Sequence, residues 1–514
     1  MLENMQNPPT INCYSLYREY KDNRVKYCSN SRIVLVHPGS SIAGADNNDG
    51  LYGDLKAASS SFPAQGLCSL AAIVRENGYN PKIIDAEPLG LDTDKTAECA
   101  MEDNPEYIGI TSYTVSFQVT LRIASKIKEI AKQRKIKTTI IIGGPHLTFL
   151  SKKVLEKYAQ FDIGIYGEGE ITIVELLDAL DHNRSLENIP NLIYREDTQV
   201  IKNRRRPPLD DMDELPLPAW DLLPQLDRYY HPAGDNLNRL PSLAIITSRG
   251  CPGQCYFCNP KGLGSKFRGH SAQYIIKMMK HLQTEFGIRD VFIADDMFLY
   301  DRENVMAFCK LLHESPDINI TWSVFGRVEY VSLDILLLMK KAGCWQIGYG
   351  LESGSEKILK LINKKQTVAQ MEKAITDANN AGIIVRGMFM VGCFGETRDT
   401  IEETIAFVKR NTIKDFHVTF FTPMPGTASF GLWPKYGTFE GDSEEGSHMS
   451  QHDIAFVPNG MDREELVAYQ RRIYRAFLKP ATMWYHFKKL FRPSVAFYVL
   501  KGGFALSYYC IVKK

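Results

Sequence analysis

The chain lacks an excess of charge of either sign, a secretory signal and a membrane-length apolar run. Lys and Arg number 61 and Asp and Glu 60, which gives a formal net charge of +1 over 514 residues. This balance provides no basic footprint for nucleic acid and no acidic tail. Residues 1–30 are polar, and no stretch reaches about 18 consecutive apolar residues. We therefore expect a cytoplasmic protein without a nucleic-acid partner.

The composition is otherwise that of an ordinary globular protein. Hydrophobic residues make up 44% and charged residues 24%, which excludes disorder, a collagen-like chain or a small disulfide scaffold as global descriptions. At roughly 150 residues per domain, the length predicts about three domains. The eleven cysteines are an odd number in a chain without an export signal. They are interpreted as reduced thiols or metal ligands.

A first α/β domain is expected over residues 31–185. Short β-branched runs alternate there with longer helical stretches, which is typical of βαβ units and a parallel sheet. The expected strands are 32–37, 82–85, 107–111, 138–142 and 162–166, and the expected helices are 63–77, 91–103, 115–134, 151–158 and a segment after Glu170. Five such strands predict a flavodoxin-like, doubly wound sheet with its ligand beyond the carboxyl ends of the strands.

Two segments flank this domain. Residues 1–30 show no clear period and are expected to form an N-terminal arm. Residues 186–238 are expected to be a linker, because five prolines fall within residues 207–224. Prolines at this density exclude a regular helix or a central strand.

Strand–helix alternation resumes over residues 239–435. Strands are expected at 243–248, 290–294, 318–324, 345–350, 383–391 and 416–422, and helices at 272–286, 302–314, 332–342, 368–381 and 397–410. About six β/α units predict a partial TIM-like barrel, with its chemistry at the C-terminal strand ends. Residues 436–514 would follow as a polar loop or lid over 436–452 and a C-terminal helical region.

The strongest chemical signal is a group of three cysteines directly after the first barrel strand. Cys251, Cys255 and Cys258 have C-x3-C-x2-C spacing. Thiolates this close can converge on one iron–sulfur cluster, and three ligands leave one iron of a cubane open. Two alternatives remain, namely a structural zinc site with His270 as fourth ligand and an electron-transfer cluster with a distant fourth cysteine. The zinc spacing lacks its usual second pair of ligands.

This motif, with Phe257 before its last cysteine, resembles that of the radical S-adenosylmethionine (SAM) superfamily. The resemblance implies that the three cysteines bind a [4Fe–4S] cluster whose open iron chelates SAM. An electron from a low-potential flavodoxin or ferredoxin type of donor would then cleave SAM to methionine and a 5′-deoxyadenosyl radical. The protein would supply orientation and a dry site around this chemistry.

Later strand ends also resemble one branch of that superfamily. Arg327 would pair with the SAM carboxylate, which suits guanidinium geometry, and Glu352 and Ser353 would contact the ribose or the methionine moiety. The residues implied in SAM binding are Phe257, Arg327, Glu352, Ser353 and Gly392. Asp295 and Asp296, after the second barrel strand, are either helix caps or ligand contacts.

In front of such a barrel, the first domain resembles the cobalamin-binding domain of B12-dependent radical SAM enzymes. The similarity lies in Gly143-Gly144-Pro145-His146 and Gly167-Glu168-Gly169-Glu170, which follow the fourth and fifth strands. The implied cobalamin contacts are Thr111, Ser112, Gly143, Gly144, His146, Gly167, Glu168, Gly169 and Glu170. Taken alone, these glycines could serve only in turns and helix caps.

One element of such domains is missing. The Asp-x-His-x-x-Gly motif that carries a cobalt-ligating histidine is absent after the first strand, where the chain reads His37-Pro38-Gly39. Base-off, His-off cobalamin is therefore expected. In the alternative, the domain has lost cobalamin and only buttresses the barrel, and His146 bonds within its own loop.

The resemblance implies methylation of an unactivated carbon in a small-molecule metabolite, with SAM as both radical source and methyl source. An apolar or planar metabolite is expected because aromatic residues of the C-terminal region could line one side of its pocket. The first alternative is radical oxidation or cyclisation of a tetrapyrrole-like substrate, as in the anaerobic magnesium-protoporphyrin monomethyl ester cyclases of the same branch. The second alternative is an iron–sulfur binding or electron-transfer protein that does not turn SAM over.

The C-terminal region is rich in aromatic residues. They are expected to pack helices, although they could close one side of an apolar pocket; the set is Tyr469, Tyr474, Trp484, Tyr485, Phe487 and Phe491. Lys488, Lys489 and Arg492 precede the interrupted apolar stretch 496–512, and a peripheral membrane contact is one interpretation of this pattern. The remaining cysteines are expected to be buried, with Cys393 near a barrel-strand end.

Overall fold

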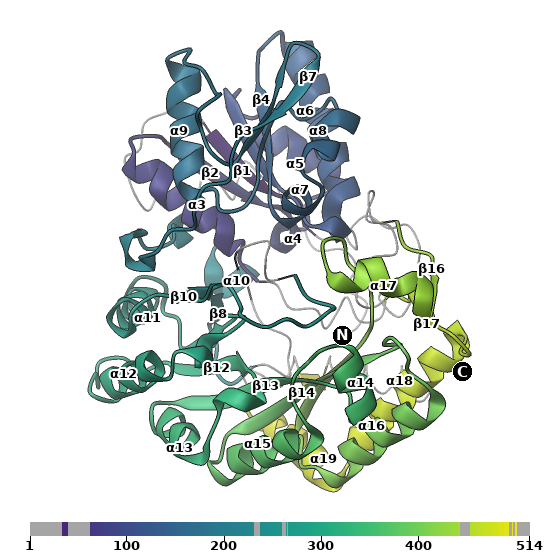
Figure 1. Ribbon diagram of the computed structural model, residues 1–514. Coiled ribbons are helices and arrows are strands. Elements are labelled where there is room, and N and C mark those ends of the chain that lie inside the picture. The colour runs from purple at the N-terminus through teal and green to yellow at the C-terminus, as the bar shows by residue number, and fades with distance from the viewer. Residues whose placement is uncertain are drawn as a thin grey trace, which may run out of the picture.

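The computed structural model describes residues 33–39, 62–230, 237–259, 264, 266–442, 453–492, 496, 499 and 500. The expected N-terminal arm and most of the expected lid over 436–452 lie outside the described residues. Two α/β bodies are stacked on each other, the N-terminal one above and the barrel below in the view of Figure 1. The C-terminal helices lie against the lower body.

The N-terminal sheet has the order expected of a flavodoxin-like domain. Its parallel strands pair in the order β2-β1-β3-β4-β5, so the order reverses beside β1. They are β1 (Ile33–His37), β2 (Pro81–Asp85), β3 (Tyr107–Thr111), β4 (Thr139–Gly143) and β5 (Ile163–Ile165). The strands read as short apolar runs because helices bury both faces of the sheet. The expected fold class is confirmed.

Helices cover the two faces of this sheet in separate apolar clusters. On one face lie α3 (Gln65–Glu76) and α9 (Glu170–Asp181). The other face packs against α5 (Thr93–Ala100), α6 (Phe117–Arg134) and α8 (Lys152–Lys157). Two short helices, α4 (Ala86–Leu89) and α7 (Pro145–Leu150), follow β2 and β4 directly.

The sheet continues into the segment expected to be a linker. Antiparallel strands β6 (Leu192–Glu196) and β7 (Gln199–Lys202) extend it beyond β5. Asp197 takes a left-handed φ of 51° in the two-residue turn between them, a conformation that Asp tolerates better than most residues. The sheet therefore extends past residue 185, and the connecting segment begins after Lys202.

The second body is an open, six-stranded parallel sheet whose strands follow chain order. The strands are β8 (Ser242–Ile245), β11 (Asp290–Ile293), β12 (Thr321–Gly326), β13 (Cys344–Glu352), β14 (Ile384–Val391) and β15 (Asp415–Phe420). The helices between them are α11 (Ala272–Phe286), α12 (Arg302–His313), α13 (Leu333–Lys341), α14 (Glu356–Leu361), α15 (Val368–Asn380) and α16 (Arg398–Arg410). A short ribbon of β9 (Ser248–Arg249) and β10 (Arg268–Gly269) follows β8. This is the expected partial barrel.

The two bodies share one apolar core. Trp220 is fully buried, donates through Nε1 to Gln65 Oε1 of α3 at 3.3 Å, and stacks on the His281 ring of α11 at 6.1 Å. The Ala219 amide donates to Cys68 O of α3 at 3.0 Å. The connecting segment after Lys202 therefore packs against both bodies, through Ala219 and Trp220.

The C-terminal region begins with α17 (Ala428–Tyr436) and a β16 (Gly437–Phe439) and β17 (Phe456–Pro458) hairpin. Helix α18 (Arg463–Phe477) packs outside the barrel, where Gln470 Nε2 donates to Val418 O at 2.9 Å. Helix α19 (Pro480–Leu490) crosses the N-terminal strand ends, because it contacts Ile413 and Lys414 before β15. Within the described part of the chain, no helix is long and apolar enough to cross a membrane.

Candidate cluster and cofactor site

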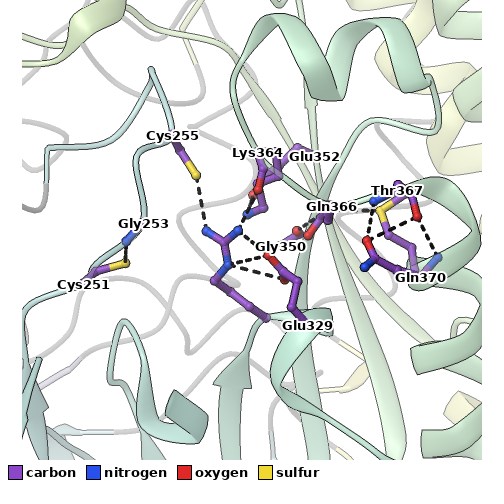
Figure 2. Close-up of polar contacts among 12 residues, drawn as sticks. Cys251, Gly253, Cys255, Glu329, Gly350, Glu352, Lys364, Gln366, Thr367 and Gln370 are labelled. Carbon is purple, nitrogen blue, oxygen red and sulfur yellow. Dashed lines mark hydrogen bonds and ion pairs between the residues drawn. The ribbon is translucent and has the colours of Figure 1, made fainter.

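The three motif cysteines lie on the loop that leaves β9. Gly250 opens this loop with a φ of 84°, and a side chain there would collide with Lys266 O, so the turn requires glycine. The Gly253 amide donates to Cys251 Sγ at 3.3 Å (Figure 2). The Tyr256 amide donates to Ile362 O at 2.9 Å and its carbonyl accepts from the Ser429 amide at 2.8 Å. The loop is therefore pinned on both sides while its thiols stay partly exposed.

The electrostatics of Cys251 and Cys258 fit a positively charged ligand between the thiols. Burial, then Asp296 and the other two thiols, raise the pKa of Cys258 to about 12. The pKa of Cys251 is also raised, by burial, Asp296 and Cys255. These groups are close enough to repel one another as thiolates, and iron among them would remove the penalty. The donor set therefore suits a cluster with thiolate ligands.

His270 is committed elsewhere and does not serve as a zinc ligand. It is buried, its Nδ1 lies 3.0 Å from Asp213 Oδ1, and its ring stacks on Tyr274 at 4.0 Å. Among the described residues, no group of three His, Cys, Asp or Glu side chains is arranged to hold a single metal ion. His270, the residue that could have supplied a fourth zinc ligand, is thus engaged with Asp213 and Tyr274, while the absence of a metal-holding group in the described part of the chain applies to the three motif cysteines as well.

Arg327, expected to pair with the SAM carboxylate, is directed at the cysteine loop. Its Nη1 lies 3.4 Å from Cys255 Sγ and its Nη2 donates to Lys364 O at 2.6 Å (Figure 2). Glu329 Oε1 accepts from Nη2 at 2.5 Å and from Nε at 3.2 Å. Burial acts to lower the pKa of Arg327, but Glu329 outweighs it and the pKa is raised. A contact with SAM would have to exchange one of these bonds.

Glu352 ends β13 with a left-handed φ of 63° and is nearly buried. Lys364 Nζ lies 2.7 Å from Glu352 Oε1 and 5.7 Å from the centre of the Phe257 ring. The predicted SAM residues Glu352 and Phe257 thus both contact a buried lysine beside the cysteine loop, and Figure 2 shows the Lys364–Glu352 pair. Sequence reasoning missed Lys364, because a lysine in the turn after α14 carries no periodic signal.

Ser353 and Gly392 bond within the protein. Ser353 is fully buried, and its Oγ lies 3.1 Å from Thr404 Oγ1. The Gly392 amide donates to Glu396 Oε2 at 2.5 Å, and the Cys393 amide donates to the same oxygen at 3.1 Å. Burial raises the pKa of Glu396 to about 7, against those two amide bonds. Both residues predicted to contact SAM therefore form hydrogen bonds that hold the chain just after β13 and β14.

Asp295 is neither a helix cap nor an exposed ligand contact. Its buried carboxylate accepts from the Thr247 amide at 2.6 Å, from Thr247 Oγ1 at 2.5 Å and from Ser248 Oγ at 2.7 Å. Burial raises the pKa of Asp295 to about 6 in spite of these bonds. Thr247 and Ser248 lead directly into the cysteine loop, so Asp295 fixes the path of that loop.

The predicted cobalamin contacts at the ends of β3 and β4 form one tight junction. The Ser112 amide donates to Gly143 O at 3.0 Å, and the His146 amide donates to Ser112 O at 3.1 Å. Gly144 has a φ of 94°, and a Cβ there would lie 2.7 Å from Ser112 O. Glycine is required at this position because two strand ends approach each other. Thr111 Oγ1 lies at the same contact.

His146 lies inside the domain. It is fully buried, stacks on Phe117 with ring centres 4.1 Å apart, and has its Nδ1 3.4 Å from Thr114 Oγ1. Burial lowers its pKa to about 4, so the ring is neutral at neutral pH. His146 therefore bonds residues that follow β3, and a direct contact of His146 with cobalamin stays a prediction.

Glu168 and Glu170, also predicted to contact cobalamin, form ion pairs with the barrel. Arg249 Nη2 lies 2.5 Å from Glu170 Oε1, and Arg268 pairs with Glu168. All four side chains are largely buried, and Arg249 is two residues before Cys251. We call these four residues the interdomain quartet. The two glycines of this segment have other neighbours. The Gly167 amide donates to Thr148 Oγ1 at 3.0 Å, and Gly169 packs near Leu70.

A polar group at the ends of β1 and β2 was not anticipated. His37 Nδ1 lies 2.8 Å from Asp85 Oδ1, and Tyr230 donates to Asp85 Oδ2 at 2.8 Å. Burial lowers the pKa of His37, but the charge and hydrogen bond of Asp85 outweigh it and the pKa is raised. The carboxylate of Asp85 thus links the sheet edge to the connecting segment.

The C-terminal edges of the two sheets meet. A Cβ on Gly426, in the loop after β15, would lie 3.2 Å from the Phe149 ring of α7 and would collide with Asn259 Nδ2. Phe149 follows the Gly143–Gly144 junction, and Asn259 is next to Cys258. Helix α7, the loop after β15 and the cysteine loop therefore pack directly against one another.

These features define a two-domain α/β protein. A doubly wound N-terminal domain packs against a half-barrel, and the half-barrel carries the three cysteines on the loop after β9. Residues 245–408 match the radical SAM superfamily, and residues 55–177 match the B12 binding domain. The chain is 33% identical to an uncharacterised methyltransferase of Pyrococcus horikoshii, over 72% of this chain and 78% of that one. It is 26% identical to the anaerobic magnesium-protoporphyrin IX monomethyl ester cyclase of Rubrivivax gelatinosus, over 89% and 79% of the two chains.

Solved structures share the fold. The radical SAM methyltransferase TsrM of Kitasatospora setae superposes with a TM-score of 0.66 at 16% identity, over 93% of this chain and 97% of that one. The cobalamin-dependent radical enzyme OxsB superposes with a TM-score of 0.69 at 16% identity, over 94% and 75%. The protein belongs to the radical SAM enzymes that carry a B12-binding domain. The cofactors of this family are the expected ones: a [4Fe–4S] cluster, SAM and cobalamin.

Proposed function

We propose that the protein methylates an unactivated carbon of a small apolar or planar molecule, using SAM and base-off, His-off cobalamin. The observation that supports this most is the packing of Phe149 and Gly426 with Asn259. It brings the ligand edge of a B12-type domain against the loop of the cluster cysteines. When bound, the cluster and SAM supply a radical for hydrogen abstraction, and cobalamin supplies a transferable methyl group.

The residues of this chain would hold and orient these groups. Cys251, Cys255 and Cys258 would bind three irons, with Arg327 steadying the Cys255 sulfur. Glu352 and Lys364 would contact the charged end of SAM, because a buried, already compensated ion pair can exchange partners with a zwitterion. The electron would come from a low-potential donor of flavodoxin or ferredoxin type.

An apolar cluster at the strand ends supports an apolar substrate. It contains Phe394 after β14, Phe421 after β15 and Phe456 of β17, and Phe257 of the cysteine loop packs against it. Cys393 is buried in the same cluster, and burial raises its pKa well above the ordinary value. The thiol is therefore an apolar packing group. Phe394, Phe421 and Phe456 are fully buried and form the apolar floor of the cluster, and the partly exposed Phe257 is the aromatic side chain among these that a flat ring could contact.

Relatives of two kinds keep a second reaction open. The Pyrococcus relative is named a methyltransferase, but the Rubrivivax relative, which matches more of this chain, is a cyclase. Oxidative cyclisation would consume the same radical without using the methyl group. The two reactions differ in their SAM products, so a product ratio separates them.

The test is anaerobic reconstitution with iron, sulfide and hydroxocobalamin, followed by removal of unbound cobalamin. Methylation predicts about one cobalt per chain and, with reductant and a small-molecule substrate, both 5′-deoxyadenosine and S-adenosylhomocysteine. Cyclisation predicts the first product without a stoichiometric amount of the second. Cys255→Ala should abolish the formation of 5′-deoxyadenosine under either reaction, and continued reductive cleavage of SAM by this variant would refute the assignment of the cluster.

A further inference from the structure

Helix α19 carries an exposed aromatic surface at the bottom of the barrel. Four side chains form it: Met483, Trp484, Phe487 and Phe491, which we call the aromatic face. We propose that the aromatic face docks the protein on the surface of an anionic lipid bilayer. The proposal concerns where the enzyme sits and is independent of the reaction that it catalyses.

The aromatic face is the most exposed apolar surface in the described structure. Phe491 is 72% exposed, Met483 60% and Trp484 57%, which are the three highest values among its large apolar side chains, and Phe487 is 47% exposed. The rings contact each other, with Trp484 stacked on Phe487 at 5.6 Å and Phe487 edge-on to Phe491 at 5.2 Å. A contiguous patch of this kind marks an interaction surface, unlike single exposed residues.

Spacing and anchoring fix the orientation of this face. Positions 483, 484, 487 and 491 lie on one side of a helix. The opposite side is bound to the barrel, since Thr482 Oγ1 donates to Ile413 O at 3.2 Å and His486 Nε2 lies 3.1 Å from Lys414 O. Lys489 is buried, with its Nζ 5.5 Å from the Trp345 ring. The helix therefore cannot roll to bury its aromatic side chains.

The charge around the face selects an anionic surface. Residues 480–514 contain six Lys and Arg and no Asp or Glu, in a chain whose overall net charge is +1. Lys488 is exposed beside the face, with its Nζ 5.2 Å from the Trp484 ring, and Arg492 is exposed next to Phe491. Trp and Phe flanked by lysines are typical of side chains that sit at headgroup level. Each basic residue near an anionic bilayer adds attraction of its own.

The positive charge around the aromatic face argues against two other partners for it, namely a second copy of the chain and the C-terminal residues 493–514. A second copy seated on this face would bring two positive surfaces together. Residues 493–514, which lie mostly outside the described residues, contain Lys501, Lys513 and Lys514 and no acid that could complement Lys488 and Arg492. An anionic lipid surface meets both the apolar and the charge requirement.

Docking here would leave the cofactor edge free. Helix α19 contacts Ile413 and Lys414, just before β15, and Trp345, at the start of β13. These are N-terminal strand ends, whereas the cysteine loop lies beyond the opposite ends of the strands. Access to the cofactors would therefore face away from the bilayer.

The test is cosedimentation of the anaerobically reconstituted full chain with two kinds of vesicles, pure phosphatidylcholine and a mixture with phosphatidylglycerol. The triple variant Trp484→Ser, Phe487→Ser, Phe491→Ser is compared with Met306→Ser, Leu337→Ser, which removes exposed apolar side chains of α12 and α13. Wild type and the control variant should bind the mixed vesicles in a salt-sensitive manner. The triple variant should partition at least about tenfold more weakly, with unchanged cluster content and circular dichroism.

The emission of Trp484 gives a second measurement. Trp220, Trp322 and Trp345 are buried, and Trp433 is half-buried beside Phe439. A blue shift on adding mixed vesicles that disappears in Trp484→Phe would therefore place the Trp484 ring in the headgroup region. Binding that is equal in the triple variant, or equal on both vesicles, would overturn the proposal. Failure of wild type to bind either vesicle would also overturn it. A triple variant that turns a dimer into a monomer would assign the face to a second copy instead.

Discussion

At the scale of single residues, the buried pair of Lys364 and Glu352 lies beside the cysteine loop, next to the Arg327–Glu329 pair. Its Nζ–Oε1 distance is 2.7 Å, and Gln366 Nε2 donates to Gly350 O at 3.1 Å, which holds the strand end that presents Glu352 (Figure 2). Removing one partner of a buried pair leaves the other charge uncompensated and costs about 3–5 kcal/mol. The pair therefore determines the polarity of this side of the site.

We expect Lys364→Met to weaken SAM binding by at least about tenfold, because Glu352 would lose the partner that compensates its buried charge. Equilibrium dialysis with SAM, with iron content measured in parallel, checks this. Lys365→Met is the matched control, since Lys365 is exposed and bonds only Gln254 Oε1, at 3.2 Å. Equal SAM affinity in the two variants would show that Lys364 has no part in the site.

Residue identities were predictable where spacing carries the information. The three cysteines stand out because their ligation depends on local spacing within one loop. The partners of Ser353 and Glu168 depend on helices and strands distant in the chain, namely Thr404 of α16 and Arg268 of β10. A polar residue at a strand end looks the same in sequence whether it faces a ligand or bonds another element.

At the scale of elements, the interdomain quartet joins the start of α9 to the two-stranded ribbon of β9 and β10, which flanks the cysteine loop. Glu170 is the first residue of α9, where its charge also suits the helix dipole. Burial acts to raise the pKa of Glu170, but the charge and hydrogen bond of Arg249 outweigh it and the pKa is lowered. The quartet thus fixes the distance between the B12-type domain and the cysteine loop.

We expect Arg249→Met to lower the free energy of unfolding by about 3–5 kcal/mol, because Glu170 would be left buried without a counter-charge. Anaerobic urea denaturation followed by circular dichroism measures this. Arg472→Met breaks the exposed pair with Glu402 on α18 and α16, and it should cost about 1 kcal/mol or less. Similar losses in both variants would contradict a special role for the quartet.

Most elements could be predicted because hydrophobic periodicity is a local property. The expected helix over 272–286 coincides with α11, which Ser271 caps by accepting from the Tyr274 amide. Strands β6 and β7 were missed because the prolines after residue 206 determined the interpretation of the whole segment. Short helices such as α7 and α14 have too few turns to show a period.

At the scale of the whole molecule, the two bodies depend on each other. One apolar cluster runs from Leu35 of β1 through Trp220 to Met279 of α11. Gln65 of α3 donates through its side chain to Ala244 O of β8, and Arg75 Nη1 of the same helix lies 2.6 Å from Asp221 Oδ2. Composition and periodicity predict two bodies, but their shared core follows only from the three-dimensional contacts of the connecting segment.

Because the core is shared, we expect one cooperative unfolding transition, with cobalamin absorbance reporting the upper body and cluster absorbance the lower one. Trp220→Ala would empty a fully buried site that contacts Gln65 and His281, at a cost of about 3–5 kcal/mol. The two absorbances should then change at different urea concentrations. Trp484→Ala removes an exposed ring of the same kind and should shift the single transition by less than about 0.5 kcal/mol. Two separate transitions already in the wild type would show that the bodies fold as independent units, and a Trp220→Ala variant that unfolds in one transition at the wild-type midpoint would show that this ring does not couple them.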